Sequence, residues 1–237
     1  MGERLWMHDL IEKMGWEIVH QDCIKETGRR TRLWDPKEVY DVLKNNRDLV
    51  NLKRIDLRFS RKLRELPDFS KARNLELVNL YNCVSLCNVH LSILSLHSLV
   101  SLDLSKCKNI KSLQSGTHLR SLRKVVIGGC PNLKEFSLSS KELRCLLLGS
   151  TGIEILHPLI RSLTKLRCLH FNGSKLKKVP LKELCCLRSL RDLRISEHAF
   201  DKPELHMLFD ALRALQILSC LNCSNLTELP NNIKQLS

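Results

Sequence analysis

Cysteine and histidine are the residues of this chain whose types and spacing could do chemistry. Cys220-x-x-Cys223 has the spacing of a redox or zinc-binding pair, and Cys185-Cys186 places two thiols in succession. A structural zinc site needs four ligands, and no second pair supplies them. The nine histidines show no His-Glu-x-x-His spacing, and Gly-x-Ser-x-Gly does not occur. We therefore predict no catalytic residue, no metal site and no enzymatic activity.

A sequence repeat accounts for the positions of many of the cysteines. The template L-x-x-L-x-L-x-x-C-x-x-L-x-x-L recurs along the chain, as in LVSLDLSKCKNIKSL (99–113) and LRKVVIGGCPNLKEF (122–136). Its eight copies begin 21–25 residues apart, at Leu52, Leu75, Leu99, Leu122, Leu143, Leu166, Leu190 and Leu215. Self-similarity at a fixed period of this length indicates a solenoid.

The spacing within the repeat predicts its structure. Alternation with period two turns the second and third leucines of each copy inward on one short strand. Strands of successive copies stack in parallel, and the Cys, Ser or Thr that follows bonds the backbone of the turn. Cys83, Cys107 and Cys130 are therefore structural, as are Cys220 and Cys223. We predict an α/β leucine-rich-repeat solenoid, a parallel β horseshoe of about eight repeats with short helices, 3₁₀ turns or extended segments on its convex side.

The first 48 residues differ from the repeats. They hold nine Lys and Arg against ten Asp and Glu, whereas residues 49–237 hold thirty against fifteen. The apolar spacing predicts one helix after Met7 and a second after Asp35, joined by a loop through CIKETGRRTRLW. We predict two domains, a helical segment over 1–48 and the repeats over 49–237. Ile11, Met14 and Ile18 are expected to cover the edge of the first repeat.

The strand alternation also predicts which side chains face the concave surface. Residues two, four and six after each first leucine lie on that side, and they include both charges. The predicted partner-binding residues are Arg54, Asp56, Arg58, Tyr81, Lys124, Leu147, His170, Asn172 and Arg194. The basic excess of the repeats lies one residue after the first leucine instead. This basic stripe consists of Lys53, Arg123, Arg144, Arg167 and Arg191.

Residues 7–43 and the first repeats together carry a family resemblance. Met7-His8-Asp9, the linker RRTRLWDPKEVYDVL (29–43) and the repeat segment 49–76 resemble plant intracellular disease resistance proteins. The closest class is that of nucleotide-binding leucine-rich-repeat receptors with a Toll/interleukin-receptor-like domain. The sequence is thus expected to cover the end of the winged-helix region and the repeats of such a receptor. Because no polar cap follows the last repeat, it is also expected to be cut, or to end early, at its C-terminus.

The resemblance implies a nucleotide switch in which His8 lies near the phosphates of bound ADP. The phosphate-binding loop G-x-x-x-x-G-K-[ST] does not occur in this sequence. A single histidine does not hold a nucleotide without the amides and the lysine of that loop. We therefore expect no cofactor in this chain, whereas full-length relatives of the family use ADP and ATP.

The function implied is recognition and autoregulation in plant innate immunity. The chain is expected to sense a pathogen effector protein, or a host protein that an effector modifies, through its concave face. The basic stripe is expected to contact the nucleotide-binding domain of a receptor. Two alternatives stay open, a decoy fragment that binds a full-length receptor, and a basic binder of nucleic acid or acidic lipid. No run approaches the ~18 apolar residues of a membrane span, so a cytoplasmic or nuclear location is expected.

Overall fold

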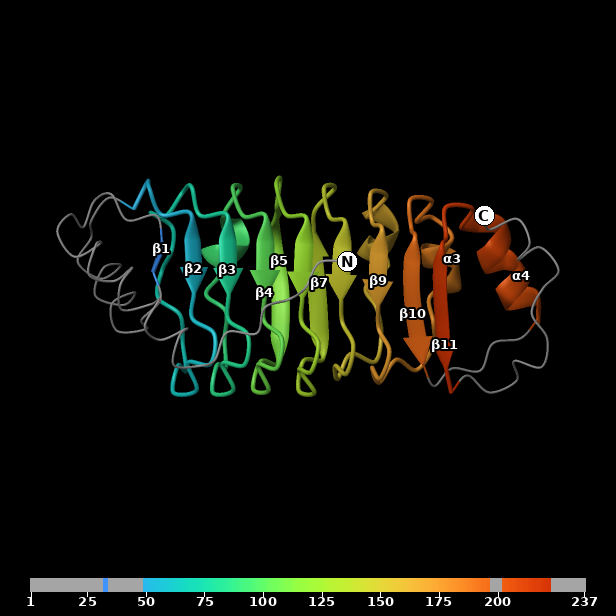
Figure 1. Ribbon diagram of the computed structural model, residues 1–237, viewed down its shortest axis with the longest axis horizontal. Helices are drawn as coiled ribbons and strands as arrows, with labels where there is room; N and C mark the ends of the chain where they lie inside the picture. Colours follow the sequence, from blue (N-terminus) through green and yellow to red (C-terminus); the bar gives the residue numbers. More distant parts are fainter. Residues whose placement is uncertain (1–31, 34–48, 197–201, 223–237) are drawn as a thin grey trace, which may run out of the picture.

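The computed structural model describes residues 32–33, 49–196 and 202–222 and shows one continuous parallel sheet (Figure 1). The sheet has nine strands in the order β1-β2-β3-β4-β6-β8-β9-β10-β11. Their bounds are β1 Arg32–Leu33, β2 Arg54–Asp56, β3 Leu77–Asn79, β4 Ser101–Asp103, β6 Lys124–Val126, β8 Cys145–Leu147, β9 Cys168–His170, β10 Asp192–Ser196 and β11 Ile217–Leu221. Each of the eight predicted repeats contributes one strand, which confirms the leucine-rich-repeat solenoid.

The core is built from the template leucines and their equivalents. Leu102 pairs in register with Val78 on one side and Val125 on the other, and all three are buried. The side chains that alternate with these residues along each strand, such as Asp103, stay partly exposed. Burying an aliphatic side chain of this size stabilises the fold by about 1.5–3 kcal/mol. Because the repeats from Leu52 to Ile195 bury the same positions, the solenoid has one continuous aliphatic core, against which the partly buried Leu218 and Cys220 of the last repeat pack.

Seven of the nine strands of the main sheet end in a turn with the same backbone conformation. Seven described residues have a positive φ, between 54° and 77°, and each lies seven positions after a first leucine. They are Phe59, Asn82, Lys106, Gly129, Ser150, Gly173 and Asn222. A left-handed conformation costs a residue other than glycine about 1–2 kcal/mol, so the repeated turn imposes a cost that the core must offset.

The Cys, Ser or Thr after this residue ties the turn to the sheet. The thiol of Cys83 donates to the Leu57 carbonyl of the preceding repeat at 3.0 Å, and Cys107 and Cys130 make the equivalent bond. Thr151, in one of the two shorter repeats, instead donates to Leu148 of its own turn at 2.8 Å. The predicted structural role of this position is confirmed. A cysteine here bonds the preceding repeat, whereas Thr151 bonds its own turn.

The shorter repeat at 143–156 also brings two backbones close together. Gly152 is buried, and a Cβ built on it would overlap the carbonyl oxygen of Pro131 in the preceding repeat. With one residue fewer after the strand, the chain takes a tighter path against its neighbour. Glycine is required here because no side chain fits between the two backbones.

Short segments of several kinds cover the other side of the core (Figure 1). They are η1 Ile93–Ser95, β5 Ser112–His118, β7 Glu135–Ser139, η2 Pro158–Ser162, α3 Leu181–Leu184 and α4 Lys202–Ala211. β5 and β7 pair in parallel as a second, two-stranded sheet. The predicted mixture of helices, 3₁₀ turns and extended segments on this side is confirmed. The opposite face of the nine-stranded sheet, which we call the open face, corresponds to the predicted concave surface.

The structure corrects one prediction near the N-terminus. Arg32 and Leu33 were expected in a loop, but they form β1, which pairs in parallel with Arg54 and Ile55 of β2. The physical reason is that an edge strand presents unpaired N–H and C=O groups, which a short extended segment satisfies. The predictions for residues 1–31 and 34–48, including both helices, His8 and the cover formed by Ile11, lie outside the described residues. The division at residue 48 stays a prediction.

Candidate functional site

The first half of the open face carries a polar hollow that runs across β2, β3, β4 and β6. Its polar lining consists of Arg54, Asp56, Asn79, Ser101, Asp103 and Lys124. The structure thus brings together three residues predicted from the alternation, namely Arg54, Asp56 and Lys124. A fourth, Arg58, lies beside the hollow, where its Nε donates to Asp56 Oδ1 at 2.9 Å. The lining of the hollow is mixed in charge, because it holds two basic residues, Arg54 and Lys124, and two acidic ones, Asp56 and Asp103.

Two aromatic rings stand where β2 and β3 end. The ring of Phe59 meets that of Tyr81 edge to face, with 5.3 Å between the ring centroids, and Lys106 Nζ lies 5.2 Å from the centroid of Tyr81. Phe59 is 54% exposed. Aromatic residues of this kind contribute most of the binding energy at many protein interfaces. Sequence reasoning found Tyr81 but missed Phe59, because the left-handed position was not recognised as a place for an exposed ring.

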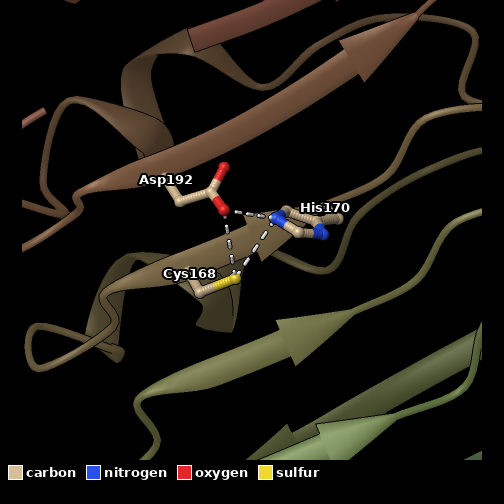
Figure 2. Close-up of side chains that lie close together, drawn as sticks. All are labelled: Cys168, His170 and Asp192. Atoms are coloured by element: carbon tan, nitrogen blue, oxygen red, sulfur yellow. Dashed lines mark hydrogen bonds and ion pairs between the residues drawn. The ribbon is translucent and has the colours of Figure 1, made fainter. Parts of the chain in front are cut away.

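The second half of the open face holds a cluster of Cys168, His170 and Asp192 (Figure 2). Cys168 and His170 are alternate residues of β9, and Asp192 of β10 lies opposite Cys168 in register. His170 Nε2 is 3.2 Å from Cys168 Sγ and 3.0 Å from Asp192 Oδ2, and the sulfur is 4.0 Å from that oxygen. The predicted residue Leu147 lies next to this cluster as the register partner of His170, and the predicted Asn172 follows His170 by two residues, beyond the end of β9.

Charge and burial set the state of the cluster. The Arg194 guanidinium donates to both oxygens of Asp192, from Nε at 3.1 Å and Nη2 at 3.2 Å. Burial alone would raise the pKa of Asp192, but the hydrogen bonds from Arg194 and His170 outweigh it and lower this pKa. Burial, followed by the neighbouring Cys145 and Asp192, raises the pKa of the Cys168 thiol to about 12. At neutral pH the cluster therefore holds a thiol beside a carboxylate.

The cluster lacks the geometry of a nucleophilic triad. In a triad one ring nitrogen of histidine faces the nucleophile and the other faces the carboxylate. Here Nε2 of His170 meets both Cys168 and Asp192, so a single nitrogen would have to serve both. A thiol with a raised pKa is also a poor nucleophile. Three donor atoms that converge on one point are suited to binding.

Sequence reasoning missed that these three residues meet. It placed His170 on the concave face as a partner-binding residue, and found no pairing for it. A signal was present, because Asp192 follows Cys168 by 24 residues, one repeat of the solenoid. Comparing residues one period apart would have placed the carboxylate beside the thiol.

The basic stripe lies along the edge where the strands begin, and all five of its side chains are exposed. The backbone aligns four of them, because the N–H groups of Arg144, Arg167 and Arg191 each donate to the preceding arginine of the stripe. Lys53 stands apart and pairs with Glu76 at 3.6 Å. A hydrogen bond from Lys165, followed by further positive charges, lowers the pKa of the Glu142 carboxyl beside Arg123 and Arg144.

The remaining cysteines divide by burial. Cys220 is partly buried and packs against the core, as does Cys185, whereas Cys186 is exposed. Cys223 lies outside the described residues, so the pairing of Cys220-x-x-Cys223 stays untested. The structural role assigned to Cys83, Cys107 and Cys130 is confirmed by their full burial and by their bonds to the preceding repeat.

Register-matched parallel strands, a cysteine at one turn position and an aliphatic core together define a leucine-rich-repeat protein. In sequence, the chain is similar to plant disease resistance proteins. It is 34% identical to disease resistance protein RML1A of Arabidopsis thaliana over 127 residues, which are 54% of this chain and 13% of that protein. It is 35% identical to the disease resistance-like protein CSA1 of the same plant, over 84% of this chain and 20% of that protein. The family resemblance predicted from the sequence is confirmed.

The chain spans a fifth or less of the length of these two relatives. No family model matches it. Among solved structures, an internalin C2 of Listeria monocytogenes is 19% identical with a TM-score of 0.39, over 76% of this chain and 69% of that one. The fold is assigned from the strand register of the chain itself. Among its described helices, none has the length and apolar character needed to cross a membrane.

Proposed function

We propose that the chain is the protein-recognition and autoregulatory module of a plant innate immune receptor. The observation that carries this proposal is the open face, which runs across all eight repeats and presents both charges beside exposed rings. Its occupant would be a pathogen effector protein, or a host protein modified by one. The similarity to plant disease resistance proteins supports this assignment.

The open face is suited to a protein partner. Arg58 and Arg194, which could otherwise bind phosphate groups, are held by Asp56 and Asp192. Phe59 and Tyr81 offer rigid apolar area beside the polar hollow. An interface with an aromatic anchor and a polar rim is typical of protein–protein recognition. We accordingly propose a binding role rather than a catalytic one.

The basic stripe would make the autoregulatory contact. An acidic surface on the nucleotide-binding domain of a receptor complements a row of exposed arginines, and such complementarity fixes register and speeds association. ADP or ATP would be held by that domain and not by this chain, because the phosphate-binding loop is not in this sequence. Partners of this kind place the proposed function in the cytoplasm or the nucleus.

Charge reversal of the stripe tests the autoregulatory contact. We expect R123E/R144E/R167E/R191E to weaken binding of the chain to a purified nucleotide-binding module from a plant disease resistance protein by at least tenfold. The matched control is K108E/K111E/K134E/K141E, which reverses four lysines that are also exposed but lie off the stripe. Equal binding by the two variants would contradict the proposed contact.

Substitutions on the open face test the recognition role. In a receptor that carries these repeats, Tyr81→Ala should abolish or reduce the defence response to a recognised effector, whereas Gln114→Ala on β5 should leave it unchanged. Gln114 is an exposed residue of β5, on the side of the core opposite the open face, where no partner is expected. A normal response from Tyr81→Ala together with Arg54→Ala would argue against recognition through this face.

One observation favours a second candidate, a basic-surface binder of nucleic acid or acidic lipid. The four aligned arginines form a row of like charges that could follow a line of phosphates. Titrations with a single-stranded oligonucleotide and with vesicles of acidic lipid at several salt concentrations distinguish the candidates. A steep, linear fall of log affinity with log salt concentration supports this candidate. If the chain binds neither probe at about 50 mM salt, the low end of such titrations, this candidate is excluded. The decoy alternative is supported if the chain binds a full-length receptor and responds to no effector.

A further inference from the structure

The sulfur of Cys168, the Nε2 nitrogen of His170 and the Oδ2 oxygen of Asp192 lie at the corners of a small triangle. Their separations are 3.2 Å for sulfur to nitrogen, 3.0 Å for nitrogen to oxygen and 4.0 Å for sulfur to oxygen. Tetrahedral Zn²⁺ has bonds of about 2.0–2.3 Å to these three donor types, which place the donors about 3.3–3.6 Å apart. The observed triangle therefore fits a tetrahedral cation after shifts of a few tenths of an ångström.

We propose that Cys168, His170 and Asp192 form a binding site for a thiophilic divalent cation of the Zn²⁺ class. One sulfur, one imidazole nitrogen and one carboxylate oxygen are a donor set that this ion accepts. A hard cation such as Ca²⁺ or Mg²⁺ prefers oxygen ligands alone. The site shares the open face with the proposed recognition surface, but metal binding is measured without a protein partner, so the two proposals are tested separately.

The sheet holds the three ligands rigidly. Leu169 and Leu193, the residues between and beside the ligands on β9 and β10, are fully buried in the core and pair in register. Ligands on paired strands are positioned more sharply than ligands on loops. The side chains of His170 and Asp192 each keep 18% of their surface exposed, so an ion can reach the site from the open face.

The surroundings supply the support that a metal ligand needs. Arg194 holds both oxygens of Asp192 and fixes the orientation of the carboxylate. Such outer partners of metal ligands usually contribute about 10–100-fold to affinity. Cys145 of β8 is the register partner of Cys168 on the side away from Asp192, so a second thiol lies on the neighbouring strand.

The test uses the whole chain, reduced and stripped of metal, titrated with Co²⁺ as a spectroscopic probe for Zn²⁺. Metal binding displaces the proton of the Cys168 thiol into solvent. We therefore expect one Co²⁺ per chain with a thiolate-to-cobalt charge-transfer band, and displacement of that band by Zn²⁺. Cys168→Ser should remove the band, and His170→Ala and Asp192→Asn should each weaken binding by at least tenfold. Arg194→Gln should weaken it by about tenfold. The matched controls, Cys87→Ser and Cys186→Ser, replace exposed thiols elsewhere and should bind as the unmodified chain does.

Two results would overturn the proposal. One is a band of full strength in Cys168→Ser, which would place the metal at other thiols. The other is no stoichiometric binding by the unmodified chain at micromolar Co²⁺ or Zn²⁺. Circular dichroism separates lost ligands from lost fold, because Cys168→Ser keeps the shape of the side chain and should keep the spectrum. If His170→Ala were unfolded, His170→Gln would serve as the second variant at that position.

Discussion

The thiol of Cys107 donates to the backbone carbonyl of Leu80, one repeat earlier, at 3.1 Å. Cys107 is fully buried, and burial raises the pKa of its thiol well above the ordinary range. The thiol therefore stays protonated, and keeps its hydrogen bond, at pH values at which an exposed cysteine would ionise. The bond shows that this template position serves the contact between neighbouring repeats.

Removing that donor should destabilise the solenoid. We expect Cys107→Ala to lower the free energy of unfolding by about 1–3 kcal/mol, because it leaves a small cavity and an unpaired carbonyl. Urea unfolding followed by circular dichroism measures the change. The control Cys87→Ala, at an exposed cysteine, should stay within about 0.5 kcal/mol of the unmodified chain. Equal losses in the two variants would show that the contact between repeats contributes little.

The thiols should differ sharply in their reactivity. Burial raises the pKa of Cys83 to about 11 and that of Cys130 to about 12, and neither side chain is exposed. We expect Cys83, Cys107 and Cys130 to react with a thiol reagent only after unfolding, while Cys87 and Cys186 react at once. Reaction at pH 8 before and after addition of denaturant measures this. C87S/C186S should lose two rapidly reacting thiols, and an unchanged fast phase would contradict the burial pattern.

Gly152 should tolerate no side chain. A Cβ there overlaps the carbonyl of Pro131, which belongs to rigid backbone, so Gly152→Ala should cost about 1–3 kcal/mol or more. Gly116 on β5 is the matched control, because a Cβ built on it has no atom within 4 Å. Gly116→Ala should be neutral or stabilise by about 0.5 kcal/mol. Thermal unfolding measures the midpoint temperatures of the two variants. Similar midpoints would contradict the prediction and mean that the two repeats can move apart to admit the methyl group.

Asp192 should make stability depend on pH at the acid end. Its pKa is lower in the folded chain than the ordinary value of 3.8, so its contribution is present above that value and is lost as the pH falls through the folded pKa. We expect Asp192→Asn to be less stable at pH 7 by about 1 kcal/mol or less. That deficit should shrink toward zero as the pH falls below 3.8. Urea unfolding at several pH values measures it, and a deficit independent of pH would assign the effect to packing.

The sequence predicts most of the fold because the repeat is explicit. Alternation of period two identifies buried residues such as Leu102 and partly exposed ones such as Asp103, and the cysteine position follows from its place in the turn. β1 could not be predicted in this way, since its two residues form a strand only because the edge of β2 is available. α4 could not be placed either, because the seventh repeat loses the template after Ile195.

The candidate site could be predicted only in part. Arg54, Asp56 and Lys124 lie on the open face because their positions within the repeat require it. Cys168 and Asp192 meet for a similar reason, since they hold the same position in adjacent repeats. The approach of one ring nitrogen of His170 to both depends instead on side-chain orientation, which the repeat pattern does not determine. Phe59 shows a third case, since its exposure depends on a left-handed turn that the residue type itself disfavours.

The solenoid has one edge along which like charges repel, because it aligns Arg123, Arg144, Arg167 and Arg191. Adjacent strands lie about 4.8 Å apart, and like charges placed directly across such a gap repel. Dissolved salt weakens this repulsion, since the screening length falls from about 10 Å at 0.1 M to about 3 Å at 1 M. Salt should therefore raise the unfolding temperature of the isolated chain. An acidic partner bound along this edge would reduce the same repulsion between the arginines.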